Sequence, residues 1–138
     1  GRLGMSREVI EGRGYRLELE FQPPLLCVHI FGNADSSLPV TSEYWLSIIH
    51  KLRTLGATQL LLLDAKESDV MSHEDLERFF VAIAGQGLEH AKIAYVEGRV
   101  DQMPHIQEAE LMALERGYRI RMFGNESDAR IWLRYGGG

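Results

Sequence analysis

The stretch QLLLLDAKESDVMSHEDL, residues 59 to 76, decides how this chain folds. Its four consecutive leucines, Leu60 to Leu63, end at Asp64, and a run this short is too brief for a helix that is buried by itself. It is typical of a central strand covered on both faces, in which the alternation of apolar and polar residues is lost. A polar loop follows, and Ser72 is placed to open a helix. In open α/β sheets, ligands and partners bind where such a strand ends and the next helix begins.

Two strands joined by a hairpin are predicted before this stretch. Apolar and polar residues alternate over residues 15 to 22, which indicates a half-buried strand suited to the edge of a sheet. Pro23 and Pro24 end this strand, because proline cannot donate a backbone hydrogen bond. Residues 25 to 31 form the next strand, and the short connection favours an antiparallel pair.

Helices and strands alternate along the rest of the chain. Apolar residues recur at helical spacing, and glycines or polar caps mark the ends of the helices. The further elements that we expect are helices from Thr41 or Ser42 to Leu55, from Ser72 to about Ile83, from about Gln102 to Arg116 and after Asn125, and strands at residues 92 to 96 and 118 to 123. The order β-β-α-β-α-β-α-β-α predicts an α/β fold with a single, mostly parallel β-sheet and an antiparallel N-terminal hairpin strand.

Length and charge limit the domain organisation and the partners. We interpret residues 1 to 4, which precede Met5, as the remnant of an expression tag, and residues 5 to 138 as one domain. The formal net charge of −5 argues against nucleic acid and against an anionic membrane surface as partners. No apolar run approaches the roughly 20 residues of a membrane span, so we expect no integral membrane segment. A single cysteine, Cys27, fits a reducing, cytoplasmic location.

Asp64 has two interpretations, and neither makes the chain an enzyme. As the last residue of a strand it is placed to accept backbone N–H bonds from the loop, a role that aspartate commonly takes in turns. With His73 it would form a carboxylate–imidazole pair suited to proton transfer, but no nucleophile accompanies that pair. His105 and Glu108 lack the spacing of a zinc site. We therefore favour the structural role of Asp64, and expect no catalytic residue, metal or cofactor.

Three features together resemble a known family. These are the element order, the LLLLD strand that leads through a loop into a helix, and the segment FGNESDARIWL at residues 123 to 133. They resemble the STAS-like domains of the anti-sigma-factor-antagonist superfamily, in particular its small stand-alone bacterial branch, which is similar in fold to the CRAL-TRIO lipid-exchange domains. The resemblance covers about residues 15 to 135. It implies a STAS-like fold and a non-catalytic, regulatory role.

The chain departs from this family at the phosphorylation site. In the family, a phosphorylatable serine lies in an Asp-Ser-Ser-Gly run at the start of the second helix. Counted without gaps from Asp64, that run falls on residues 72 to 75, Ser-His-Glu-Asp, so the phosphoacceptor position holds an imidazole or a carboxylate. This departure argues against a phosphorylation switch, although Glu74 in the first turn of a helix could imitate the charged state. Ser68 and Ser72 are nearby hydroxyls, and Ser72 is explained as a helix cap.

The first function that we expect is regulation through binding of another protein. The partner surface would be the loop and the start of the second helix, because loops beyond strand ends are carried on a rigid scaffold. The residues expected on this surface are Asp64, Ser68, Ser72, His73 and Glu74. The sequence does not identify the partner, and it leaves the oligomeric state open, with a homodimer as one alternative.

The second function, which the similarity to lipid-exchange domains implies, is carriage or sensing of a small apolar ligand or lipid. Trp45, Phe79 and Phe80 are interpreted most simply as core residues. They could instead line an apolar cavity between the helices and the sheet. An enclosed cavity beside these rings would favour the second function, and a solid core there would exclude it.

Overall fold

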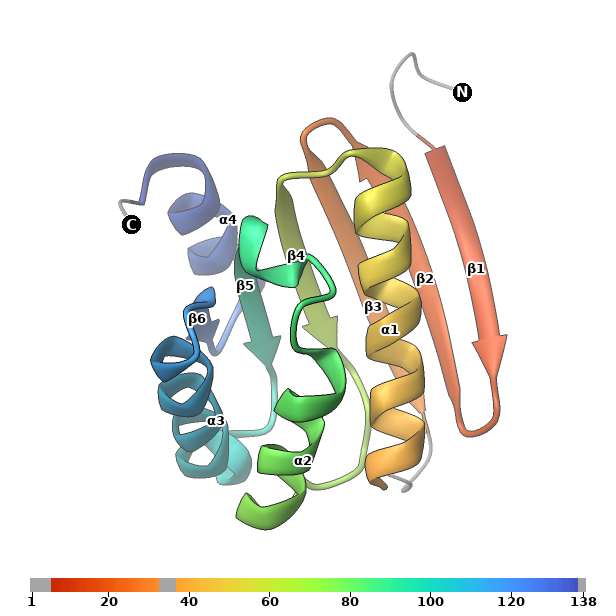
Figure 1. Ribbon diagram of the computed structural model, residues 1–138. Coiled ribbons are helices and arrows are strands. Elements are labelled where there is room, and N and C mark those ends of the chain that lie inside the picture. Colours follow the sequence, from red (N-terminus) through yellow and green to blue (C-terminus); the bar gives the residue numbers. More distant parts are fainter. Residues whose placement is uncertain (1–5, 33–36, 137–138) are drawn as a thin grey trace.

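The computed structural model describes residues 6–32 and 37–136. These residues form one six-stranded sheet with helices on both of its faces (Figure 1). The strands are β1 (Ser6–Gly12), β2 (Tyr15–Gln22), β3 (Leu25–Gly32), β4 (Gln59–Asp64), β5 (Lys92–Glu97) and β6 (Arg119–Phe123). The helices are α1 (Leu38–Leu55), α2 (His73–Ile83), α3 (Met103–Glu115) and α4 (Glu126–Tyr135), with short 3₁₀ turns at Leu88–His90 and Val100–Gln102. The expected tag remnant, residues 1 to 4, lies outside the described residues.

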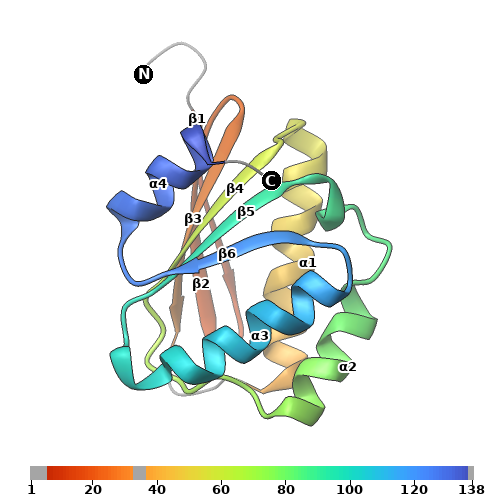
Figure 2. The same cartoon turned by 90° about the vertical axis from the view of Figure 1, so that its left-hand side faces the viewer.

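The sheet has the order β1-β2-β3-β4-β5-β6. The first three strands pair antiparallel, and β3, β4, β5 and β6 pair parallel. Helices α1, α2 and α3 cover one face of this sheet and α4 covers the other, as the edge-on view in Figure 2 shows. The mixed, mostly parallel α/β sheet predicted from the sequence is confirmed.

The tetraleucine strand β4 lies in the middle of the sheet, between β3 and β5. Leu60, Leu61 and Leu62 are fully buried and Leu63 is 8% exposed. Leu60 and Leu62 face α1, α2 and α3, while Leu61 and Leu63 pack under α4. Both faces are therefore apolar, which explains why the strand shows no alternation.

One strand was missing from the sequence prediction. Strand β1 pairs with β2 over its whole length, so β2 is an interior strand and not the expected edge. Most side chains of β1 are exposed, and a strand without a buried face gives no apolar alternation by which to recognise it. The observed order of the main elements is thus β-β-β-α-β-α-β-α-β-α.

The caps of the helices agree with the prediction at α2 and α4 but not at α1. Ser72 Oγ accepts the backbone N–H of Asp75 at 3.2 Å, and Asn125 Oδ1 accepts that of Asp128 at 2.9 Å. The expected start of α1 at Thr41 or Ser42 was wrong. The helix begins at Leu38, and its N-cap is Ser37, whose side chain accepts the backbone N–H of Val40. The proline in the first turn is tolerated there, because the backbone N–H groups of a first turn have no partner within the helix.

The edge strand β6 carries a side-chain partner on its backbone. Glu110 of α3 reaches the strand, and its Oε2 accepts the backbone N–H of Met122 at 2.9 Å. A carboxylate in this position occupies a donor that an added strand would otherwise use.

Candidate functional site

A cavity of about 100 Å³ lies between the sheet and the helices α1, α2 and α3. Trp45 of α1 and Phe79 and Phe80 of α2, the three rings named from the sequence, all line it. The ring centroids of Trp45 and Phe79 are 5.8 Å apart, and those of Phe79 and Phe80 are 5.3 Å apart, both in edge-to-face geometry. The interior beside these rings is therefore hollow and mostly apolar.

One end of the cavity is polar because of how the strands end. In the parallel pair of β4 and β5, Asp64 lies opposite Glu97 at the carboxyl ends of both strands. Residues two apart on a strand share a face, so Tyr95 lies on the same side as Glu97. All three line the cavity together with Lys66 and Ser68 from the loop that follows β4.

Asp64 and Lys66 form a buried ion pair at this end. Lys66 Nζ lies 2.7 Å from Asp64 Oδ2, and the side chains of Lys66 and Asp64 are 7% and 4% exposed. Asp64 Oδ1 also accepts the backbone N–H of Lys66 at 2.9 Å, which confirms its expected role in the turn. The hydroxyl of Tyr95 donates to Asp64 Oδ2 as well. The buried charges are thus paired and hydrogen-bonded, as buried charges must be.

The pKa values of the cluster follow from burial and from this pairing. Burial raises the pKa of Tyr95 well above its ordinary value, and the Asp64 carboxylate raises it further. Burial alone would lower the pKa of Lys66, but its interactions with Tyr44 and Asp64 outweigh that effect and leave it raised. Burial also raises the pKa of Tyr44. Lys66 therefore stays charged and both phenols stay protonated at neutral pH.

Glu97 and Ser68 complete the polar end. Glu97 is 4% exposed, and burial raises the pKa of its carboxyl group. Its Oε1 accepts the backbone N–H of Arg99 at 3.0 Å. Ser68 is 8% exposed, and its Oγ is buried without a hydrogen-bond partner among the described residues. An unpaired buried hydroxyl costs about 1–3 kcal/mol, so this atom requires an explanation.

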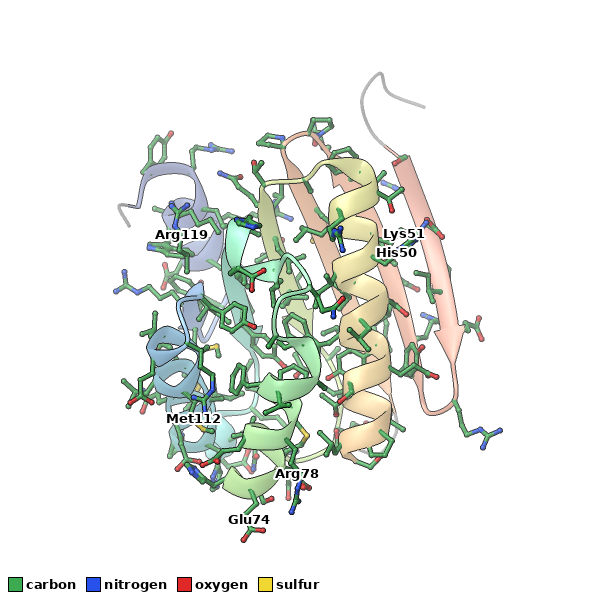
Figure 3. All side chains as sticks on the ribbon, in the orientation of Figure 1. His50, Lys51, Glu74, Arg78, Met112 and Arg119 are labelled. Carbon is green, nitrogen blue, oxygen red and sulfur yellow. The ribbon has the colours of Figure 1, made fainter. Side chains whose placement is uncertain are left out.

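The residues expected on the partner surface separate into two groups. Asp64 and Ser68 lie in the interior, at the polar end of the cavity. Ser72, His73 and Glu74 are exposed in the first turn of α2 or at its cap. Figure 3 shows Glu74 projecting from the end of α2, away from the sheet.

His73 does not meet Asp64, so the conceivable carboxylate–imidazole pair is not formed. Its Nε2 lies 2.8 Å from Glu77 Oε1 on the same helix, and its Nδ1 lies 3.7 Å from Glu108 Oε2 on α3. Within residues 6–32 and 37–136, no group of three or more His, Cys, Asp or Glu residues is arranged to hold a metal ion. In the same ranges, no helix is both long and apolar enough to cross a bilayer.

The sequence interpretation missed most of the polar cluster. Lys66, Tyr95 and Glu97 were not singled out, because charged residues in a loop or at a strand end are ordinarily solvated. A signal did exist, since Asp64 and Glu97 each follow an apolar strand directly. The carboxyl ends of neighbouring parallel strands meet at one sheet edge, so two such carboxylates come together there.

Comparison with known proteins identifies the fold. No protein-family model matches this chain, and no curated protein matches it. The structure is similar to the crystal structure of an anti-sigma factor antagonist from Mycobacterium paratuberculosis, with a TM-score of 0.52 over 95% of each chain. The two sequences are 17% identical, so this similarity bears on the fold alone. The α/β architecture described above is therefore a STAS-like fold, as the sequence resemblance implied.

Proposed function

We propose that this protein is a non-catalytic regulatory domain that binds another protein through the start of α2. We call Ser72, His73 and Glu74 the docking turn. The similarity in fold to an anti-sigma factor antagonist supports a regulatory role, because that solved protein is named for acting on a regulatory partner. The observation that carries the proposal is that the docking turn is exposed just beyond the carboxyl end of the buried strand β4.

The surroundings of the docking turn suit a partner with a basic surface. Glu74 and Asp75 stand in the first turn of α2, Glu77 follows one turn later, and Glu108 approaches from α3. Asp75 is paired with Arg78 at 3.1 Å, so the acidic character of this surface comes from the three glutamates. Acidic side chains at a helix start complement the macrodipole, so their charge does not destabilise the helix. Charge complementarity of this kind speeds association and selects among partners.

The docking turn supports a permanently acidic surface and not a phosphorylation switch. The hydroxyl of Ser72 already accepts the backbone N–H of Asp75, which is the work of a helix cap. Ser68 is buried and therefore out of reach of a kinase in this conformation. Glu74 then supplies the negative charge that phosphorylation would add elsewhere in this fold.

A capture experiment tests the docking turn. The double variant His73→Ala/Glu74→Ala should lose the partner protein that the unmodified chain recovers from an extract of its own cells. The matched control is Glu126→Ala/Ser127→Ala, which changes two exposed residues in the first turn of α4 on the opposite face. Quantitative mass spectrometry of the recovered proteins should show loss only for the α2 variant. Equal recovery with all three proteins would refute the proposed surface.

The cavity favours a second candidate function, the sensing or carriage of a small apolar ligand. Its volume of about 100 Å³ is of the same order as the roughly 150 Å³ of an engineered apolar cavity that admits benzene. A ligand of ring size fits this space better than a long-chain lipid does. Helix α2 would link the two functions, because Leu76, Phe79 and Phe80 line the cavity while the same helix carries the docking turn.

A further inference from the structure

We propose that the cavity selects a small, uncharged ring compound that carries one hydroxyl group, a phenol-like molecule, and that Ser68 is its hydrogen-bond partner. This inference rests on the second candidate function and adds the chemical class of the ligand. Three independent features of the site support it: the shape of the apolar part, the hydrogen bonds at the polar end and the balance of charge there.

The apolar part of the cavity suits a flat ring. Trp45, Phe79 and Phe80 line it from the helices, and Ile93 and Tyr118 line it from the side of the sheet. Aromatic groups attract one another through offset or edge-to-face contacts, which are worth about 0.5–1.5 kcal/mol beyond the burial of apolar area. A ring placed among these side chains would gain such contacts with more than one of them.

The hydrogen bonds at the polar end leave one group for a ligand. Asp64, Lys66 and Tyr95 bond to one another, and Glu97 accepts the N–H of Arg99. Among the described residues that line the cavity, Ser68 Oγ is the buried side-chain oxygen or nitrogen that has no partner. A hydroxyl group on the ligand can both donate to and accept from a serine, and would therefore remove the cost of that unpaired atom.

The charges at the polar end disfavour an ionised ligand. Lys66 is neutralised by Asp64, and Glu97 is a further buried carboxyl group close to them. A ligand carboxylate would be repelled by ionised Glu97 and would find no unpaired cation among the described residues that line the cavity. Any ion would also lose its hydration on entering a mostly apolar cavity, which costs several kcal/mol. An uncharged head group avoids both penalties.

The test uses the purified chain with three probes of similar size: phenol, benzene and benzoate. Dissociation constants are measured at neutral pH by titration of the ¹⁵N-labelled protein followed by NMR. We expect phenol to bind up to about tenfold more tightly than benzene, the value of one net hydrogen bond. Benzoate should show no saturable shifts in the residues that line the cavity.

Variants assign the preference to Ser68. Ser68→Ala should reduce phenol affinity to that of benzene and leave benzene affinity unchanged. The matched control is Ser42→Ala, because Ser42 Oγ is also buried and unpaired but Ser42 does not line the cavity. Ser68→Cys keeps the volume with a weaker donor and should give an intermediate affinity, and it serves in place of the alanine variant if that variant does not fold.

The outcomes separate this inference from the function on which it rests. Equal affinities for phenol and benzene, unaffected by Ser68→Ala, would overturn the preference for a hydroxyl group. The binding of both probes would still support the ligand function of the cavity. Preferential binding of benzoate would overturn the charge argument. Ala109→Leu fills the cavity from α3 and should abolish the binding of every probe. If no probe binds even to the unmodified protein, the ligand function and this inference both fail.

Discussion

Two lysines are buried in this protein, one on each face of the sheet, and their ammonium groups have different partners. Lys66, at the cavity, pairs with the carboxylate of Asp64. Lys92, under α4, donates to the carbonyl oxygens of Trp132, Leu133 and Gly136 at 2.9, 3.3 and 2.6 Å. The last carbonyls of a helix have no partner within it and carry partial negative charge, so a lysine there acts as a cap.

The comparison separates a face that serves packing from the face on which we propose a function. The cluster under α4 is small and apolar, and its lysine completes the end of a helix. The face under α1, α2 and α3 contains a cavity and a buried ion pair, which contributes little stability relative to a well-packed apolar core. A costly arrangement that stability does not require is a reason to look for function at that place.

The largest expected effect breaks the ion pair at the cavity. Asp64→Ala leaves the Lys66 ammonium buried without a counter-charge and should lower the free energy of unfolding by about 3–5 kcal/mol. The double variant Asp64→Leu/Lys66→Met replaces both charges with apolar groups and should recover most of that loss. Urea denaturation measures both. A double variant as unstable as the single one would show that the pair itself stabilises the fold.

The next effect concerns the lysine on the opposite face. Lys92→Met removes one donor from each of three carbonyl oxygens at the end of α4 and should cost about 2–3 kcal/mol of unfolding free energy. The carbonyls of Trp132 and Leu133 keep a second donor, the backbone N–H of Gly136 and the side-chain amide of Gln59. The control is Lys51→Met, at the residue labelled in Figure 3, because Lys51 forms an ion pair with Glu8 at 2.7 Å. That partly exposed ion pair is worth about 0–1 kcal/mol. Similar losses for the two variants would contradict the capping role of Lys92.

The helix caps on the two faces should give smaller and nearly equal effects. Ser72→Ala and Asn125→Ala each remove one side-chain acceptor at the start of a helix, and each should cost about 1 kcal/mol. Native-state hydrogen exchange should show faster exchange in α2 for the first variant and in α4 for the second. Exchange that rises across the whole chain for either variant would mean that these helices do not open separately.

The smallest effect is a change in pH dependence at Glu97, whose carboxylate keeps one hydrogen bond from Arg99. Burial raises the pKa of Glu97, so between its unfolded and folded pKa values the native state binds more protons than the unfolded state. Stability from this group is present below the unfolded pKa of about 4.3 and is lost as pH rises through the folded pKa. Glu97→Gln should therefore be the more stable protein at pH 7. An unchanged pH profile in urea denaturation would contradict the raised pKa.

The sequence predicted elements that have a buried side and missed the one that lacks it. In β4 and β2 the apolar residues stand at the buried positions, so the pattern of apolar residues in the sequence predicts which faces of these strands are buried. Strand β1 is held by backbone pairing with β2, which depends little on which side chains it carries. The start of α1 was placed late because Thr41 is a good cap type, yet it is buried within the helix.

The site was predicted only in part for a related reason. Trp45 was identified because it belongs to the apolar stripe of α1, and Phe79 and Phe80 because they belong to the apolar stripe of α2. The burial of Lys66 and Ser68 depends on the path of the loop after β4, which is held by contacts with Arg99 and Gln102 that are distant in the sequence. Ser68 was grouped with Ser72, although Ser68 is buried and Ser72 is exposed.

The carboxylate of Glu110 on the last strand has a consequence for how copies of this protein can associate. A sheet whose two margins both accept new strands can add molecules without limit and form fibres. Here Glu110 holds the Met122 amide at one margin, so growth through that side is hindered. Association through strand pairing would then involve the β1 edges of two molecules. Such an assembly is a symmetric dimer that leaves no free β1 edge for a third molecule.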